Sequence, residues 1–485
     1  MSGIILDRVS NTIIQHNPHT ENWSPEGKTT CSEICWAAAE ENRQIPLANE
    51  QRLASVPTFS VAAMGRNQQL DVAVVGAGWY GCHIAIELSQ IGHHVRLVEK
   101  ENEILSRCSG TFGIRLHRGP HYPRSPATRR NCQTTFDRFI EAYPELVYWH
   151  DESIYAYGLK DAQGYPSKTS LQAFEDVCFE TKSCRRIDAK TRYTDVAAAF
   201  DLAEPSIATG AELRRCIQAR LAQTDVQLSL NIRVQDVHSN SEGVTLCLSQ
   251  TGENWEQKAD FVINATGYQT LLEERLQISR TLYDLSVVYQ ACIAFKYEDQ
   301  TPGLRPISFI VMDGWFPCLM PKIGDRKGFK DYVLTHGCYT ILGSYKQPKS
   351  AHAVLRGIQP STLEKLQRAS EHEMCRFWPA FKERFTYSGW ESAVLAKPRS
   401  GVEFRSSLTF AKGRIVYVIP GKISNVFTAY DEVLELLDTA RLVHDGVQIA
   451  ETGTLRASVE ELQPSALSVD PRSTHNLQTL QRFCS

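Results

Sequence analysis

Three glycines, Gly76, Gly78 and Gly81, have a spacing that favours the binding of a pyrophosphate. Gly76 permits a tight turn, Gly78 lets the backbone approach a ligand, and Gly81 lets a helix pack close to the preceding strand. Glu99 ends a second apolar strand roughly 20 residues later, where a carboxylate can accept hydrogen bonds from ribose hydroxyls and would repel the additional phosphate of NADP. The pattern therefore predicts a dinucleotide site. The alternative is a structural glycine turn in a unit that binds no ligand.

The segments around these glycines predict the elements that such a site requires. Residues 70–75 form a short apolar run, and the helical pattern that follows them stops at Gly92. The helix begins near Trp79 and Tyr80, so its unpaired N–H groups and the positive end of its dipole point at the pyrophosphate. Residues 95–99 then complete a strand–turn–helix–strand unit.

A second segment, from Ser109 to Arg124, concentrates groups that can transfer protons and bind anions. It places three arginines, two histidines and a tyrosine in an expected loop or irregular strand: Arg115, Arg118, Arg124, His117, His121 and Tyr122. A histidine with a pKa near neutrality can accept a proton from a substrate hydroxyl or amine. An arginine can bind a carboxylate. The alternatives are that these side chains brace the phosphates of a cofactor or only link two domains.

The composition of the 485-residue chain is that of a large globular protein. Hydrophobic residues make up 42% and charged residues 22%, which excludes global disorder. The formal net charge of -3 gives no electrostatic argument for nucleic acid binding. No uninterrupted apolar run reaches the roughly 18 residues of a membrane span. The start of the chain lacks the features of a signal peptide, so we expect the 14 cysteines to be reduced thiols in a cytoplasmic protein.

Strands and helices alternate through the rest of the chain, whereas its first 69 residues are polar and show little periodicity. We expect the following elements: a helix at 212–221, a strand at 261–263, strands between 286 and 345, a helix at 362–377, and a strand at 415–419 that leads into a helix at about 426–442. The polar start has a possible short helix at 32–42 and reads as a flexible extension. Its His and Cys residues are irregularly spaced, so we predict no metal site.

From about residue 70 to 445 the chain resembles the superfamily of FAD-dependent oxidoreductases that contains D-amino acid oxidase, glycine oxidase, sarcosine oxidase and L-2-hydroxyglutarate oxidase. The resemblance rests on the glycine unit with Glu99, the turn at 108–110, a helix–strand pair leading to Val234, the stretch 262–267, and a late glycine, Gly421, that opens the last helix. It implies FAD as the cofactor. It also implies an α/β fold, with a discontinuous Rossmann-like FAD-binding domain of the glutathione-reductase type and an α+β substrate domain built on a mixed or antiparallel sheet.

The resemblance also implies which residues contact FAD. In this family the residue matching Val234 meets the adenine side, the stretch matching 265–267 passes the pyrophosphate, and the turn at Gly421 faces the pyrimidine edge of the flavin. The helix after Gly421, capped by Ser424 or Asn425, and the Lys422 ammonium would stabilise negative charge on the reduced flavin; the alternative for Lys422 is an exposed loop lysine. The predicted cofactor-binding residues are Gly76, Gly78, Trp79, Tyr80, Gly81, Glu99, Ser109, Gly110, Val234, Ala265, Thr266, Gly267, Gly421, Lys422 and Ile423.

For catalysis, the resemblance places residues 109–124 beneath the flavin ring. His117 matches a histidine of the L-2-hydroxyglutarate oxidase branch, so we predict it as the general base, with His121 and Arg115 as further catalytic candidates. The arginine and tyrosines that bind the substrate carboxylate in D-amino acid oxidases have no counterpart that we can place. The substrate class therefore stays open.

Together, the resemblance and the patterns divide the chain into four parts. The predicted parts are an extension at 1–69, an FAD-binding domain at 70–150, about 205–275 and about 395–445, a substrate domain at about 151–204 and 276–394, and a peripheral tail at 446–485.

The predicted function is the oxidation of a CH–NH or CH–OH bond of a small substrate, with hydride transfer to flavin N5 and O2 or another electron acceptor as the second partner. One alternative is a flavoenzyme for a larger, carbohydrate-like or natural-product substrate. Further alternatives are a non-catalytic FAD-binding protein and a flavin monooxygenase that uses NADPH.

Overall fold

The computed structural model describes residues 5–7, 12–14, 69–111, 114–267, 287–324, 328–398, 404–439 and 447–449. The chain separates into two units, residues 1–68 together with Ser485, and residues 69–484. The described part of the first unit is an antiparallel pair of short strands, β1 (Ile5–Asp7) and β2 (Thr12–Ile14). The possible helix at 32–42 and the irregular His and Cys residues of the extension lie outside the described residues.

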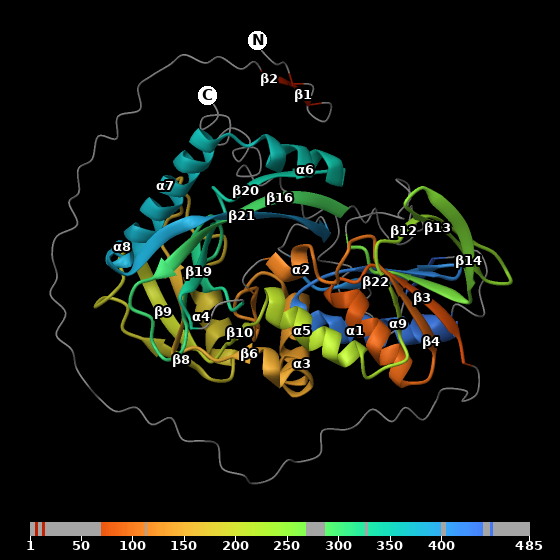
Figure 1. The fold of residues 1–485 in the computed structure, drawn as a ribbon. Coiled ribbons are helices and arrows are strands. Elements are labelled where there is room, and N and C mark those ends of the chain that lie inside the picture. Colours follow the sequence, from red (N-terminus) through yellow and green to blue (C-terminus); the bar gives the residue numbers. More distant parts are fainter. Residues whose placement is uncertain are drawn as a thin grey trace, which may run out of the picture. The chain divides into compact units, whose positions relative to one another are not determined.

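A seven-stranded sheet forms the first half of the second unit (Figure 1). Its strands, in spatial order, are β11 (Gln227–Ser229), β4 (His94–Val98), β3 (Asp71–Val75), β15 (Phe261–Asn264), β23 (Ile415–Ile419), β22 (Leu408–Lys412) and β24 (Val447–Ile449). The first five are mutually parallel, and β22 is antiparallel to both of its neighbours, β23 and β24. Because these strands come from well-separated stretches of the chain, the predicted discontinuous α/β fold is confirmed.

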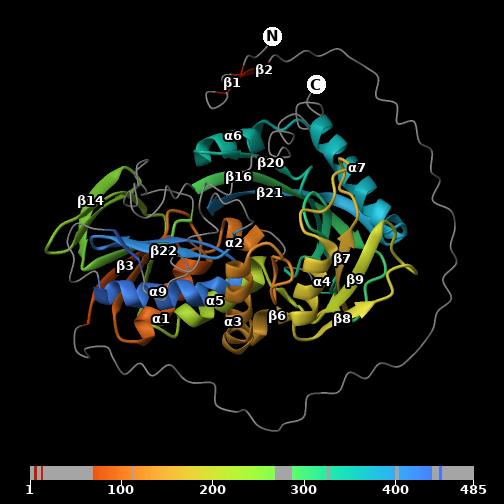
Figure 2. The same ribbon diagram turned by 180° about the vertical axis from the view of Figure 1, so that it is seen from behind.

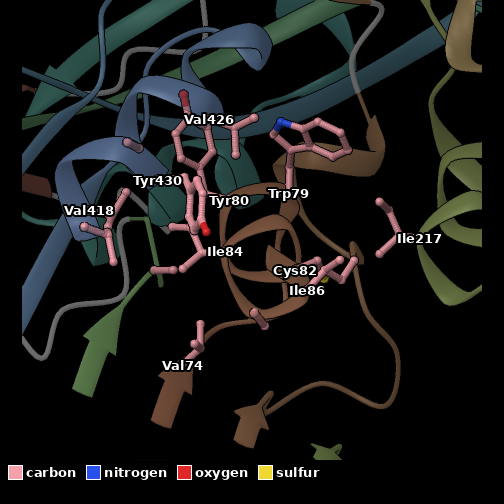
Figure 3. Close-up of a cluster of buried hydrophobic side chains, with 14 of the residues drawn as sticks. Val74, Trp79, Tyr80, Cys82, Ile84, Ile86, Ile217, Val418, Val426 and Tyr430 are labelled. Carbon is pink, nitrogen blue, oxygen red and sulfur yellow. The ribbon is translucent and has the colours of Figure 1, made fainter. Parts of the chain in front are cut away.

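Helices cover one face of this sheet and a small sheet covers the other (Figures 1 and 2). The helices are α1 (Trp79–Gln90), α5 (Gly210–Leu221) and α9 (Val426–Thr439), and the small antiparallel sheet consists of β12 (Arg233–Ser239), β13 (Val244–Gln250) and β14 (Glu253–Ala259). Figure 3 shows Tyr80 and Ile84 of α1 beside Val426 and Tyr430 of α9 in the shared core. Each fully buried aliphatic side chain here stabilises the fold by about 1.5–3 kcal/mol.

The second half of this unit is built on a mixed sheet in which β7 and β17 form a parallel pair. Its strands, in spatial order, are β20 (Ile341–Tyr345), β16 (Val287–Asp299), β19 (Asp331–His336), β18 (Pro317–Pro321), β17 (Ile307–Met312), β7 (Glu152–Gly158), β9 (Val196–Leu202) and β8 (Cys184–Ile187), with β21 (Phe385–Pro398) also paired to β16. The helices of this half are α4 (Leu171–Glu180), α6 (Pro348–Gly357), α7 (Pro360–Phe377) and α8 (Phe381–Arg384).

A small three-stranded sheet carries the segment that the sequence analysis marked for chemistry. Its strands, in spatial order, are β5 (Ile114–Arg115), β10 (Ser206–Ile207) and β6 (Val147–Tyr148). The short helix α2 (Cys108–Thr111) precedes β5, and α3 (Pro126–Ala142) with the 3₁₀ turn η1 (Pro144–Leu146) leads to β6. Pairing of β5 with β10 brings residues 116–118 next to residues 203–205, because Leu116 donates its N–H to the Pro205 carbonyl at 2.9 Å.

Two observations bear on the environment of the chain. In the described ranges, no helix combines the length and the apolar character needed to cross a membrane. The cysteines of these same ranges are free thiols. The cytoplasmic location stays a prediction.

Removal of residues 1–63 should leave the FAD-binding fold intact, because the sequence before Met64 has few periodic apolar residues that a core would need. The truncated and full-length proteins should have the same flavin content and melting temperatures within a few degrees. An insoluble truncated protein, or one that cannot retain FAD, would show that the extension is part of the fold.

Candidate active site

A cavity of about 760 Å³ lies between the seven-stranded sheet and the mixed sheet. This volume is in the range of small-molecule sites, roughly 300–1,000 Å³. Apart from Gly110, whose surroundings are not described, every predicted cofactor-binding residue lines it except Gly81. The predicted catalytic residues Arg115, His117 and His121 line the same cavity, so the structure brings both predicted sets together.

The three glycines around the start of α1 differ in the space that an added Cβ would find, and only Gly78 has room beside it for a ligand. Gly76 has a φ of +100°, and a Cβ there would lie 2.9 Å from the Ala265 carbonyl oxygen. A Cβ at Gly81 would lie 1.9 Å from the Gly76 carbonyl oxygen, so this glycine is required for helix–turn packing. A Cβ at Gly78 would meet only the Ser109 Oγ, at 3.6 Å. Among the residues that the structure describes, no other atom lies within 4 Å of that Cβ, and this is where a pyrophosphate would approach the backbone.

The Glu99 carboxylate is hydrogen-bonded to the backbone of the glycine turn. Its Oε2 accepts a hydrogen bond from the Ala77 N–H at 2.7 Å, and its Oε1 accepts one from the Glu101 N–H at 3.0 Å. Each carboxylate oxygen has a second lone pair. The carboxylate is therefore held in place and can still accept hydrogen bonds from the hydroxyls of a ribose.

Hydrogen bonds from Trp79 and Tyr80, the first two residues of α1, connect this helix to the Gly421 loop. The Tyr80 hydroxyl donates to the Lys422 carbonyl at 2.5 Å and accepts from the Gly421 N–H at 3.0 Å. The Trp79 Nε1–H donates to the Ile423 carbonyl at 2.8 Å. These bonds hold the two predicted ends of the cofactor site at a fixed spacing.

The residues after Gly421 form the 3₁₀ turn η2 (Ile423–Asn425) before α9 begins. Of the two predicted capping residues, Asn425 accepts the Lys422 N–H at 2.8 Å, whereas Ser424 accepts a hydrogen bond from the Thr135 hydroxyl at 2.9 Å. Lys422 is not an exposed loop lysine: its ammonium lies 4.8 Å from the centre of the Tyr122 ring. Burial lowers the pKa of Lys422 to about 8.

The arginines of the 109–124 segment are engaged by protein groups. Arg115 is buried, forms an ion pair with Glu204 (Nε to Oε2, 2.8 Å) and donates to the Ser153 hydroxyl. The Arg118 Nε donates to the Ala203 carbonyl at 3.0 Å. The Arg124 Nε donates to Asp313 Oδ2 at 2.5 Å. These contacts link the segment to the strands of the mixed sheet and of the small sheet, which was one of the alternatives open from the sequence.

His117 is buried, with 6% of its surface exposed, and its ring is stacked on His121 with centroids 4.5 Å apart. Its Nδ1 lies 3.1 Å from the Tyr155 hydroxyl. Burial, together with the positive charges of Lys422, Arg115 and Arg405, holds the pKa of His117 well below its ordinary value. The expectation of a pKa near neutrality is therefore corrected: the imidazole is neutral over a wider range of pH.

Several residues in or beside the cavity were not singled out from the sequence. Arg405 lines the cavity, and Tyr155 and Glu204 lie behind its wall, in contact with the His117 ring. His336, which the sequence placed in a segment that could reach the flavin, lines the cavity as well. Glu204 stands in the short stretch between β9 and β10, and no local pattern marks it. No sequence pattern marks Arg405 as a site residue either; it lies shortly before β22.

Comparisons with known proteins agree with this geometry. The family model described as "FAD dependent oxidoreductase" matches residues 71–404. The FAD-dependent monooxygenase kojA of Aspergillus flavus is 42% identical over 421 residues, which cover 85% of this chain and 97% of that protein. The FAD-dependent monooxygenase FPY4 of Fusarium mangiferae is 29% identical over 372 residues, 76% of this chain and 91% of that protein.

Among solved structures, glycine oxidase from Geobacillus kaustophilus shares the fold, with a TM-score of 0.55 and 16% identity over 78% of this chain and 97% of that one. The glycine turn, the carboxylate of Glu99 and the open space at Gly78 fit FAD as the group that this cavity holds. The chain therefore belongs to the family of FAD-dependent oxidoreductases.

Proposed function

We propose that this oxidoreductase removes a hydride from a CH–OH or CH–NH bond of its substrate while His117 takes the proton of the hydroxyl or amine. Bound FAD would supply the acceptor for the hydride. The single observation that supports the proposal most strongly is the position of the His117 ring in the wall of the cavity, with its Nδ1 3.1 Å from the hydroxyl of the buried Tyr155. Burial and nearby positive charge lower the pKa of this imidazole, which favours its neutral form. A neutral imidazole can accept a proton, whereas an imidazolium cannot.

The contacts of the arginines in the 109–124 segment favour a hydroxyl-bearing substrate over an amino acid. Arg115, Arg118 and Arg124 each bind a protein group, so this segment has no arginine dedicated to the carboxylate of an amino acid. The mixed sheet lines its part of the cavity with apolar and hydroxyl-bearing side chains, among them Met312, Phe316 and Thr335. We therefore favour a hydroxyl-bearing substrate, including the larger carbohydrate-like or natural-product class, over a simple amino acid.

The test is anaerobic reduction of the purified FAD-loaded enzyme by a panel of amino acids, amines, 2-hydroxy acids and sugars. Bleaching of the flavin absorbance by a hydroxyl compound, without any reduced nicotinamide, is the expected result. Bleaching by amino acids alone would overturn the preference for hydroxyl substrates. The non-catalytic alternative is not retained, because the chain belongs to an enzyme family.

A second candidate is monooxygenation, which the names of the relatives kojA and FPY4 favour. In that reaction one atom of O2 enters the product, the other leaves as water, and a reductant supplies two electrons. The two candidates differ in a direct measurement. Incorporation of ¹⁸O from ¹⁸O2 into the product, with bleaching that requires NADPH, would establish the monooxygenase. Oxidation of the substrate under anaerobic conditions would exclude it for that substrate.

Replacement of Lys422 by methionine should lower the reduction potential of bound FAD. We expect the Lys422 ammonium to stabilise the negative charge of the reduced flavin, and methionine keeps the length of the side chain without its charge. Because the pKa of Lys422 is about 8, the ammonium is present below that pH and is lost above it. The difference in potential between the two proteins should therefore be largest below about pH 8 and should shrink at higher pH. Equal potentials at pH 7 in a redox titration would contradict this role.

A further inference from the structure

A buried chain of hydrogen bonds leads from the His117 ring to a carboxylate that the sequence analysis did not single out. His117 Nδ1 lies 3.1 Å from the Tyr155 oxygen, and the Tyr155 hydroxyl donates to Glu204 Oε2 at 2.8 Å. Tyr155 is 0% and Glu204 1% exposed, so bulk water does not compete for these bonds. Protein groups, and not solvent, therefore determine which atom donates and which accepts in each of these hydrogen bonds.

The ionised Glu204 carboxylate can only accept hydrogen bonds in this network. The Arg118 N–H donates to its Oε1 at 2.6 Å, and the Arg115 guanidinium lies against its Oε2 with an Nε–Oε2 distance of 2.8 Å. Arg115 also lies over the Tyr155 ring, with its guanidinium carbon 4.4 Å from the centre of the ring. All of these neighbours present hydrogen or positive charge to the carboxylate, so its partner Tyr155 must direct its single hydrogen toward Glu204.

The tautomer of His117 follows from this order. A tyrosine hydroxyl has one hydrogen, and the Tyr155 hydrogen is used by Glu204. The Tyr155 oxygen can then only accept from His117, which requires the hydrogen of the neutral ring on Nδ1. We infer that Tyr155 and Glu204 are positioning residues that hold His117 as the Nδ1–H tautomer and leave the lone pair on Nε2 for the substrate proton. The inference rests on the proposed function only for the role of that lone pair.

Two further contacts fix the plane of the ring. His117 is stacked on His121 at an interplanar angle of 15°, and the Tyr122 ring meets it edge-on at 86°. The backbone beside His117 is fixed as well, because the N–H groups of its neighbours Leu116 and Arg118 are bound to Pro205 and Glu204. A 180° rotation of the ring about Cβ–Cγ would place the carbon Cδ2 opposite the Tyr155 oxygen and would lose the hydrogen bond at Nδ1.

The test is nitrogen NMR of the FAD-bound enzyme labelled with ¹⁵N-histidine, with the signals of His117 identified by their loss in His117→Gln. We expect a protonated Nδ1 and a lone-pair Nε2 between about pH 6 and pH 8. Tyr155→Phe removes the acceptor, and Glu204 Oε2 is 3.5 Å from Nδ1, too far for a good hydrogen bond. This variant should therefore show a mixture of tautomers. It should also reduce its flavin about tenfold more slowly, with the FAD content and KM unchanged.

Tyr157→Phe is the matched control. Tyr157 lies on the same strand, but its hydroxyl donates to the Thr169 carbonyl and not to the His117 network. Tyr157→Phe should have the same His117 tautomer and the same rate of flavin reduction as the unchanged enzyme. If Tyr155→Phe does not fold, the unchanged enzyme still tests the inference, because a protonated Nε2 would overturn it. An unaltered tautomer in Tyr155→Phe would overturn it too.

The NMR measurement needs no substrate, so it separates this inference from the proposed function. If Nδ1 carries the hydrogen and His117→Gln still reduces its flavin at the normal rate, the positioning network stands and the proposed base is wrong. If Nε2 carries the hydrogen and His117→Gln is slow, His117 acts in the reaction but Tyr155 and Glu204 do not set its tautomer.

Discussion

Replacement of Gly78 by leucine should abolish FAD binding while the chain still folds. The φ of Gly78 is -75°, which any residue adopts, and a Cβ there would meet only Ser109 Oγ, at 3.6 Å. The added side chain therefore enters the space beside the start of α1, which the pyrophosphate needs. We expect the affinity for FAD to fall by at least about a hundredfold, or about 2.7 kcal/mol. The measurements are the flavin content per mole of protein and the melting temperature of the apo-protein.

Two other glycines supply the controls for this experiment. Gly357 ends α6 away from the cavity and has nothing within 4 Å of its added Cβ, so Gly357→Leu should keep both the flavin and the melting temperature. Gly76→Ala should instead destabilise the apo-protein, because of its φ of +100° and the close Ala265 carbonyl. Full flavin content in Gly78→Leu would show that the pyrophosphate does not pass this turn.

The elements that carry the proposed cofactor site could be predicted because their determinants are local in the sequence. The turn at Gly76, the helix that follows it, its end at Gly92 and the carboxylate of Glu99 all lie within one strand–turn–helix–strand unit. Gly92 indeed has a φ of +98°, as the end of a helix favours. Each of these residues has a conformational requirement that its own type and neighbours reveal.

The partners of the proposed catalytic residues could not be predicted, because they meet through long-range pairing. His117 stood out by its type, but Glu204 reaches it through the pairing of β5 with β10, and Tyr155 through the mixed sheet. The crowded arginines looked available for a substrate carboxylate. Their protein partners Ser153, Ala203 and Glu204 are distant in sequence, so only the fold shows that they are engaged.

Among the elements that the sequence analysis missed, the structure explains two, α3 and β21. The helix α3 begins with Ser125 as its N-cap, followed by proline at the first position, which is a usual start signal, but polar residues interrupt its buried stripe. The long strand β21 pairs with β16 over thirteen residues, yet most of its side chains are only partly buried. It therefore lacks the clear alternation of apolar and polar residues that marks a half-buried strand.

His117→Gln should lower the rate of flavin reduction by a hundredfold or more while FAD stays bound. A positioned general base contributes roughly 10²–10⁴ to a rate, and glutamine cannot accept the proton. The predicted cofactor contacts are Gly78, Glu99 and the Gly421 loop, which line the cavity and do not include His117, so we expect the flavin content not to change. His121→Gln is the comparator: it removes the stacked ring and should have a smaller effect. An unchanged rate per mole of bound FAD in His117→Gln would remove this residue from the mechanism and make His121 and Tyr122 the next candidates.

The pH dependence gives this prediction a second, independent test. A base works in its unprotonated form, and the pKa of His117 is held well below 6.5 by burial and by nearby positive charge. The rate of flavin reduction in the unchanged enzyme should therefore stay level from about pH 7.5 down to about pH 6 and fall only in more acidic solution. A change near pH 8 would report Lys422 instead. If the rate fell with a midpoint near pH 6.5, and His117→Gln lost that fall, His117 would be the base but would be more exposed to water than the structure shows.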